Sequence, residues 1–382
     1  MREWKTYRLG DLIDVNKNSI NKNIKYDVIE YLDTASVTEN RFSDFQKISL
    51  DDAPSRAKRI VKENDIIYST VRPILRHYGI VKNVKPNSIV STGFAVLSAK
   101  KIDPNFLFYY LTTDEVVYFL NSVAEANTTT YPAFNASLFE NIEVTIPENI
   151  NTQTQIAQIL TSLDDKIELN LQMNQTLEAM AQALFKEWFV DFKFYGFDGE
   201  LVNGLPKGWR MGKVGEIFYP KRGRNITKSE AIEGIFPVVA GGLEPSCYHN
   251  ESNTKEPVIT ISSSGANAGF VRLYQTPVWS ADSCFIDSSI FPFVHFCYMF
   301  LKSNQKNIYD SQEGSAQPHI YPRHIMDLNI CVGNESVVQK FEEIVTPFFE
   351  KMKYNSLQIQ SLTQTRDTLL PKLMCGKIKV KA

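Results

Sequence analysis

Two stretches of this chain carry an apolar pattern that is typical of long, paired helices. Each follows a capping signal, Thr152-x-x-Gln155 in the first and Ser336-x-x-Gln339 in the second, and each has ten positions with a heptad-like spacing of four and three residues. The first series is Ile156, Leu160, Leu163, Ile167, Asn170, Asn174, Leu177, Ala181, Leu184 and Trp188. The second is Phe341, Val345, Phe348, Met352, Asn355, Ile359, Leu362, Arg366, Leu369 and Leu373. Over residues 152–189 the first helix is expected to be about 55 Å long, at roughly 1.5 Å per residue.

Block charges predict that these two helices pair with each other. Residues 148–198 carry 3 basic and 8 acidic side chains, and residues 334–382 carry 8 and 5, so the two blocks attract. We expect an antiparallel coiled coil within one chain, with a kink near Pro347 and a kink or break near Pro371. The residues expected to pair the helices are Leu163, Asn170, Leu177, Trp188, Phe348, Asn355, Leu362 and Leu369. The alternative is two separate core helices, each packed on its own domain.

Asn170 and Asn355 occupy equivalent positions of the two seams, where apolar side chains pack better. In an antiparallel pair related by a pseudo-twofold axis, equivalent positions near the middle approach each other. We therefore predict that the two amides lie close together and form a hydrogen bond, directly or through a water molecule. Such a buried polar pair fixes the register at some cost in stability.

The chain also contains an internal repeat. Trp4–Ile13 is similar to Trp209–Phe218, and weaker similarities link Ile66-Ile67 to Val258-Ile259, Gly79–Val81 to Gly269–Val271, and Tyr131-Pro132 to Gln317-Pro318. The order of these matches predicts a duplicated unit, each copy a globular domain followed by a long helix. The predicted segments are a first globular domain at 1–150, a helix at 151–192, a second globular domain at 193–333 and a helix at 334–382.

Both globular segments are expected to be mixed α/β domains. Short β-branched runs predict strands, and helical apolar spacing predicts helices over 106–119 and 293–301. The predicted strands are Asp65–Thr70, Ser88–Leu97, Ile142–Ile146, Val258–Ile261, Cys284–Ile286 and Leu328–Val332.

Several function classes are not supported by the sequence. There is no apolar run of about 18 residues that would span a membrane. The phosphate loop, the dinucleotide-binding glycine motif and the zinc-protease motif are absent, so we expect neither catalytic residues nor a metal site. The five cysteines form no Cys-x-x-Cys pair, which favours a reducing, cytoplasmic location. The overall charge of −2 conceals two basic clusters, with 10 basic and 5 acidic residues over 41–85 and 7 and 1 over 207–228; such clusters are typical of phosphate contacts.

Three motifs resemble the specificity subunits of type I restriction-modification systems. Ala181–Phe192 resembles the end of their central helix, Leu205–Trp209 the start of their second target-recognition domain, and Leu369–Ile378 their C-terminal signature. The family often has a Gly-Ser/Thr-x-Gln-Pro loop late in each recognition domain. The second half keeps it as Gly314–Pro318, whereas the first half has Thr128–Pro132, without the glycine or the glutamine.

The resemblance implies a DNA-reading subunit without catalysis of its own. Each recognition domain would read one half of a bipartite, asymmetric DNA site, and the paired helices would separate the halves and bind two methyltransferase subunits. Two nuclease-translocase subunits could join. S-adenosylmethionine, ATP and magnesium would belong to those partners. A coiled-coil scaffold without a DNA role and a divergent DNA methyltransferase or nuclease remain alternatives.

Candidate DNA contacts were selected among basic and polar residues near strand ends and loops, because arginine, lysine and amide side chains contact phosphates and base edges. They are Ser69, Thr70, Arg72 and Arg76 in the first domain, and Lys221, Arg222, Arg224, Ser263, Asn267, Gln317 and His319 in the second.

Overall fold

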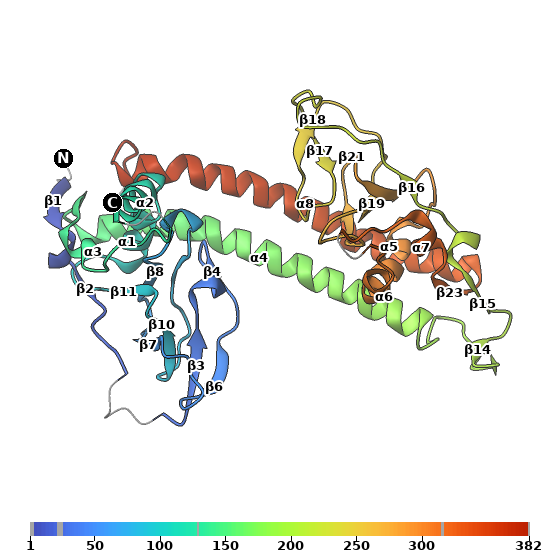
Figure 1. Ribbon diagram of the computed structural model, residues 1–382, viewed down its shortest axis with the longest axis horizontal. Helices are drawn as coiled ribbons and strands as arrows, with labels where there is room; N and C mark the ends of the chain where they lie inside the picture. Colours follow the sequence, from blue (N-terminus) through green and yellow to red (C-terminus); the bar gives the residue numbers. More distant parts are fainter. Residues whose placement is uncertain (1–3, 21–25, 128–129, 315–316, 381–382) are drawn as a thin grey trace. The chain divides into compact units, whose positions relative to one another are not determined.

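The computed structural model describes residues 4–20, 26–127, 130–314 and 317–380, and its chain divides into two compact units (Figure 1). Unit 1 comprises Met1–Glu168 and Gln360–Ala382, and unit 2 comprises Leu169–Ile359. Two helices of 40 residues, α4 (Ile150–Phe189) and α8 (Glu335–Met374), contribute to both units. The mixed α/β class with two tandem domains and long helices is confirmed.

The described part of unit 1 contains two four-stranded sheets, ordered β2-β11-β8-β9 and β6-β3-β10-β7, with the pairs β1-β12 and β4-β5. Its strands are β1 (Trp4–Arg8), β2 (Ile13–Val15), β3 (Val28–Leu32), β4 (Val37–Thr38), β5 (Arg41–Phe42), β6 (Gln46–Ser49), β7 (Ala57–Ile60), β8 (Ile66–Ser69), β9 (Tyr78–Ile80), β10 (Ser88–Ser91), β11 (Phe94–Ala99) and β12 (Glu143–Pro147). Its helices are η1 (Leu9–Asp11), η2 (Thr34–Ser36), η3 (Pro73–Leu75), α1 (Pro104–Leu111), α2 (Asp114–Asn127) and α3 (Leu138–Asn141).

Unit 2 repeats this plan. Its sheets are ordered β16-β22-β19-β20 and β18-β17-β21, with the pairs β15-β23 and β13-β14. Its strands are β13 (Leu201–Val202), β14 (Leu205–Pro206), β15 (Arg210–Lys213), β16 (Lys221–Arg222), β17 (Phe236–Val239), β18 (Cys247–His249), β19 (Val258–Ser262), β20 (Val271–Tyr274), β21 (Trp279–Ser280), β22 (Ser283–Asp287) and β23 (Asn329–Val332). Its helices are η4 (Val214–Glu216), α5 (Val294–Ser303), α6 (Gln305–Asp310) and α7 (Pro322–Met326).

The sheet order confirms the internal repeat. In each unit a strand near the start of the globular part pairs antiparallel with its last strand, β1 with β12 and β15 with β23. Each central sheet is antiparallel, and each second sheet contains one parallel pair, β10 with β3 and β17 with β21. The strands β8 and β19 occupy the same place in their sheets, and every residue of both is buried. Their largely β-branched and apolar sequences suit a strand that is covered on both faces.

Two predicted elements are each split in two. Residues 88–97 form β10 and β11, which belong to different sheets, and residues 106–119 fall within α1 and α2. Thr112 and Thr113 separate these helices, and both hydroxyls bond back to backbone carbonyls, as threonine does where a helix ends. Apolar spacing alone does not detect such a local interruption.

The two long helices pair antiparallel within each unit, as predicted. In unit 1, Arg366 of α8 forms an ion pair with Asp164 of α4 at 2.8 Å. In unit 2, Asn170 donates to Gln358 and Asn355 donates to Asn174, both at 2.8 Å. Residue numbers therefore rise along one helix as they fall along the other. All twenty seam positions are buried or half-buried, which confirms the heptad assignment.

The details of the helix ends and of the prolines differ from the expectation. α8 continues through Pro347 and Pro371 without interruption, so the break expected at Pro371 is absent. Both helices begin before the predicted capping boxes. The Asn149 side chain accepts from the Asn151 N–H at the start of α4, so Asn149, not Thr152, supplies the cap. Asparagine is a strong capping residue, and the Ser/Thr-x-x-Gln patterns that follow it therefore predict the start of each helix slightly too late.

Asn170 and Asn355 do not form the direct hydrogen bond with each other that the sequence predicted. Each amide donates instead to a residue about one turn along the opposite helix, Gln358 and Asn174 respectively. The two seams are staggered, so equivalent residues are not face to face. Asn170 and Asn355 are 1% and 0% exposed, and the Oδ1 atom of each is buried without a partner.

Replacing both Asn170 and Asn355 by leucine is expected to raise the free energy of unfolding by about 1–3 kcal/mol. The change removes two buried, unpartnered carbonyl oxygens, each of which costs on the order of 1–3 kcal/mol, and the half-buried Gln358 and Asn174 can turn to water. Thermal denaturation measures the effect. Leucine at the exposed Thr176 and Ser356 of the same helices is the control, with a shift within about 0.5 kcal/mol. A less stable double variant contradicts the prediction.

Candidate DNA interface

Two loops that are distant in the sequence meet in unit 1. The loop after β8 is hydrogen-bonded to the loop before α3: the Arg72 N–H donates to the Pro132 carbonyl at 2.8 Å, and the Phe134 N–H donates to the Thr70 carbonyl at 3.0 Å. An isolated β-bridge joins the central residues of the two loops, Val71 and Ala133. We call the two segments, residues 70–72 and 131–134, the unit 1 loop pair.

The same loop pair exists in unit 2. The Gly265 N–H donates to the Pro318 carbonyl at 3.0 Å, and the Ile320 N–H donates to the Ser263 carbonyl at 2.9 Å. Ser264 and His319 form the matching bridge. We call residues 263–265 and 317–320 the unit 2 loop pair. Backbone bonds thus align the two copies residue by residue and confirm the Tyr131-Pro132 match to Gln317-Pro318.

The same bonds correct the other expected matches. Tyr68 pairs with Tyr78 in unit 1, and Ile261 pairs with Val271 in unit 2. Tyr78 is therefore equivalent to Val271, and Gly79 is equivalent to Arg272 and not to Gly269. The two loops before β9 and β20 have the same length, eight residues each (70–77 and 263–270), so the two glycine-containing tripeptides that look alike in sequence fall at different positions of the strand pairing.

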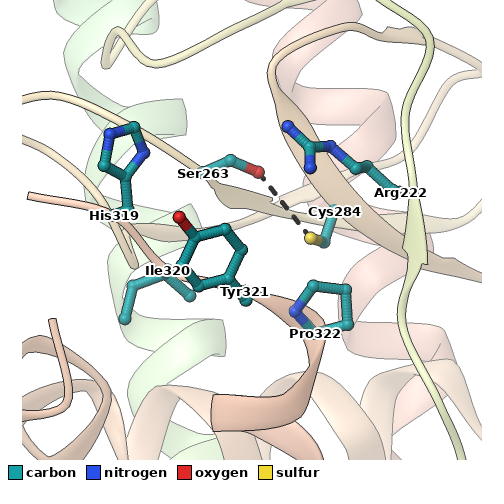
Figure 2. Close-up of a pocket in the computed structure, with 7 residues that line it drawn as sticks. All are labelled: Arg222, Ser263, Cys284, His319, Ile320, Tyr321 and Pro322. Atoms are coloured by element: carbon teal, nitrogen blue, oxygen red, sulfur yellow. Dashed lines mark hydrogen bonds between the residues drawn. The ribbon is translucent and has the colours of Figure 1, made fainter. Parts of the chain in front are cut away.

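A small hollow lies beside the unit 2 loop pair, with room for about one water molecule (Figure 2). Its lining brings together three of the predicted contacts from separate elements, Arg222 of β16, Ser263 after β19, and His319. Figure 2 shows their side chains around the contact between Ser263 and Cys284, with Tyr321 across the hollow. His319 is stacked on Tyr321 with ring centroids 6.0 Å apart. The lining combines polar side chains with the apolar Ile320 and Pro322.

The Cys284 thiol in this hollow is not a nucleophile candidate. Its sulfur lies 3.7 Å from the Ser263 hydroxyl. Burial raises the pKa of Cys284 above its ordinary value, more than the Ser263 hydroxyl lowers it. A thiol with a raised pKa stays neutral and unreactive near pH 7.

Lys221, Arg222 and Arg224 form an exposed basic edge on unit 2. Lys221 and Arg222 lie in the edge strand β16, and Arg224 follows closely. Gly223 is required between them, because a Cβ atom there would lie 2.3 Å from the Ser280 carbonyl oxygen. Within the described parts of the chain, none of the three basic side chains has a carboxylate at ion-pair distance. They are thus available to phosphates.

Replacing Lys221 or Arg222 by alanine is expected to weaken binding to all DNA sequences alike. The salt slope should become shallower by about one unit for each lost phosphate contact. Binding isotherms of the subunit with its partner proteins, measured over a range of salt concentrations, test this. Lys228, also exposed and also basic, is a matched charge control. An unchanged slope in both variants places the phosphate contacts elsewhere.

The four candidates of unit 1 have different surroundings. Arg72 is exposed, and its guanidinium lies over the Tyr131 ring, 5.2 Å from the centroid. Arg76 forms ion pairs with Asp114 at 2.6 Å and with Glu39 at 3.7 Å. The hydrogen bond that Arg76 donates to the Asp114 carboxylate raises the pKa of Arg76 further above its ordinary value. Arg76 therefore fixes the loop onto α2 and is not available as proposed from the sequence.

Ser69 and Ser263 are likewise not available as exposed DNA contacts, in contrast to the prediction. Ser69 is 1% exposed and donates its hydroxyl to the Val71 carbonyl, and Ser263 is 6% exposed. In place of exposed base contacts, both serines support the loops from beneath. Thr70 is half-buried with its hydroxyl on the Gly93 carbonyl.

Asn267 is half-buried and Gln317 is exposed, so both stay candidates. The Ser315-Ala316 part of the family-like loop and Thr128-Thr129 lie outside the described residues. Tyr131 and Tyr321 were missed as candidates, although Tyr131 could have been found because it precedes the proline aligned with Gln317-Pro318.

Over the described ranges, no helix is long and apolar enough to cross a membrane, and no group of three or more His, Cys, Asp or Glu side chains could hold a metal ion.

Comparison with known proteins identifies the family. The model of the type I restriction modification DNA specificity domain matches residues 1–179 and 206–364, one match per copy of the repeat. The chain belongs to this family. It is 27% identical to the type I restriction enzyme HindI specificity subunit of Haemophilus influenzae, covering 99% of this chain and 100% of that protein. It is 29% identical to the MjaIX specificity subunit of Methanocaldococcus jannaschii, covering 85% of this chain and 79% of the relative.

The fold of this specificity subunit is also found in a solved structure. The S subunit of a type I restriction-modification system from M. genitalium has a TM-score of 0.63 at 21% identity, with 97% of this chain and 96% of that chain covered. The architecture predicted from the three motifs is thereby confirmed.

Proposed function

We propose that this specificity subunit reads a bipartite, asymmetric DNA site, one half per unit, and holds methyltransferase subunits at that site. The single observation that carries the proposal is the loop pair, built from the same backbone bonds in both units but bearing different side chains. Identical frames with different polar groups suit the reading of two unequal half-sites, because base-edge contacts carry the sequence information.

The long helices supply the scaffold of the proposed complex. Their seam residues are used within the helix pair, yet within unit 2 several large apolar side chains of α4 and α8 remain exposed. These are Leu169, Met180, Ile344, Tyr354 and Leu357. Exposed apolar side chains on the outer faces of paired helices suit contact with a protein partner, and two methyltransferase subunits are the partners that the duplication favours. Restriction subunits with nuclease and translocase activity would join the same core.

The subunit itself is proposed to be non-catalytic. S-adenosylmethionine would be bound by the methyltransferase subunits, and ATP and magnesium by the restriction subunits, at the chromosomal DNA in the cytoplasm. Two observations support this: the loop pairs present arginine, amide and aromatic groups, which bind bases and phosphates, and the Cys284 thiol of the neighbouring hollow is unreactive.

Genome-wide methylation mapping tests the proposal. Cells expressing the methyltransferase subunits are compared with and without this subunit, and a two-part, gapped motif is expected only when it is present. Purified subunit incubated alone with DNA and labelled S-adenosylmethionine is expected to transfer no methyl groups. Methylation by the subunit alone would instead support a divergent methyltransferase. An unchanged map, together with no gel shift in the presence of the methyltransferase, would leave only a coiled-coil scaffold.

A further inference from the structure

One position of the loop pair differs between the two units in a way that has a backbone cost. Arg72 and Gly265 are equivalent, because each donates its N–H to the carbonyl of the loop proline, Pro132 or Pro318. Both have left-handed backbone conformations, with φ of 47° and 81°. Glycine adopts this conformation freely, whereas residues with a Cβ adopt it rarely. Unit 1 thus holds an arginine where the local backbone favours glycine.

The Arg72 side chain is exposed and makes few contacts within the protein. Arg72 is exposed, and its only described hydrogen bond from the guanidinium is one N–H to the Thr130 carbonyl, at 3.4 Å. No carboxylate lies at ion-pair distance from it among the described residues, in contrast to Arg76, which Asp114 and Glu39 neutralise. The loop therefore carries one arginine that anchors it and one that is free for a ligand.

The Tyr131 ring orients this free arginine. The ring lies 5.2 Å from the centre of the guanidinium, a cation–π contact that restricts the side chain before DNA arrives. Tyr131 comes from the second segment of the loop pair, at the position of Gln317 in unit 2. The two units thus expose a polar side chain from opposite segments of the loop pair: Arg72 from the strand loop in unit 1 and Gln317 from the proline loop in unit 2.

We propose that Arg72, oriented by Tyr131, specifies a guanine in the half-site read by unit 1. A planar guanidinium with free N–H groups matches the O6 and N7 acceptors of guanine in the major groove, the commonest specific arginine contact. This inference rests on the proposed DNA-reading function and adds the residue and the base.

Arg72→Gly is the decisive variant. It places at this site the residue that unit 2 already has, so folding is expected to be preserved or improved, and thermal denaturation verifies that. In the methylation map, one G·C position of the half-site assigned to unit 1 should become permissive. Discrimination at that position should fall roughly 5- to 150-fold, while the other half-site stays unchanged.

Further variants separate base reading from simple charge. Arg72→Lys keeps the charge but not the two-pronged geometry, so it should relax the same position. Tyr131→Ala should relax it in part because the arginine loses its support, and Tyr131→Phe, which keeps the ring, should retain the wild-type motif.

Three results would overturn the inference while leaving the proposed function intact. The first is a wild-type half-site for unit 1 without any G·C pair. The second is an unchanged motif in the Arg72→Gly variant. The third is a uniform loss of affinity for all sequences with a shallower salt dependence, which identifies a phosphate contact. A wild-type complex that yields no two-part motif, by contrast, refutes the proposed function itself.

Discussion

Exchanging residues 1–147 for the first domain of another family member is expected to replace one half of the methylated sequence completely and to leave the other half as it was. The reason is that each unit has its own central sheet, its own core and its own loop pair. No base-edge candidate of unit 2 belongs to the exchanged segment. The change should be all-or-none at one half-site.

The chimera must respect the packing of unit 1 on the helices. Its main core includes Ile156 and Leu160 of α4 and Leu373 and Met374 of α8. A second chimera that also takes residues 148–168 and 360–382 keeps the whole of unit 1 from one parent and controls for mismatched helix faces. Lengthening α4 and α8 together should alter only the gap between half-sites.

Methylation mapping of both chimeras gives the answer. A change in both halves after either exchange contradicts independent reading. A change in neither half, in a complex that still methylates, shows that residues 1–147 do not carry the specificity.

Replacing Glu342 by alanine is expected to lower the free energy of unfolding of unit 2 by about 4 kcal/mol. The Glu342 carboxylate of α8 accepts hydrogen bonds from the His295 and Phe296 N–H groups, at 3.0 and 2.9 Å, and its Oε1 lies 2.8 Å from the His295 Nδ1. α5 has no capping side chain of its own at its first turn. Hydrogen bonds to a charged group contribute about 1.5–3 kcal/mol each, and buried donors left unpaired add a penalty.

Glu342 is nearly buried, at 14% side-chain exposure, whereas its neighbour Glu343 is exposed and accepts a hydrogen bond from Gln339, one turn earlier. Glu343→Ala is therefore the matched control and should change stability by less than about 0.5 kcal/mol. Urea denaturation followed by tryptophan fluorescence reports on unit 2, because three of the four tryptophans, Trp188, Trp209 and Trp279, lie in it. Equal stability of the two variants would show that the cap contributes little.

Much of the architecture was readable from local patterns. The seam positions, the antiparallel pairing and the repeated order of elements were predicted because apolar periodicity and charge are properties of contiguous residues. Boundaries were less accurate. The helices begin at Ile150 and Glu335, directly after Asn149 and Asn334, and not at the predicted boxes, because capping is decided by backbone geometry over a few residues.

The candidate site was predictable only in outline. The sequence pointed to residues in both loop pairs and to Lys221 and Arg222, which the structure places on an exposed edge, but it did not separate Arg72 from Arg76. Asp114, 38 residues away, neutralises Arg76, and such a partner is defined only by the folded chain. The burial of Ser69 and Ser263 is of the same kind, since each lies at or directly after the end of a central strand, β8 or β19, whose sheet is assembled from strands distant in the sequence.

The sequence by itself thus determined that this protein is a duplicated α/β unit with two long helices that pair, because these features follow from periodicity, charge and internal similarity. The tertiary structure alone decided which side chains are free to meet DNA. Hydrogen bonds between segments about 60 residues apart, such as that from Arg72 to Pro132, align the two loop pairs. They show that an arginine occupies in one unit the left-handed position that glycine occupies in the other, because backbone conformation and long-range pairing emerge only when the chain has folded.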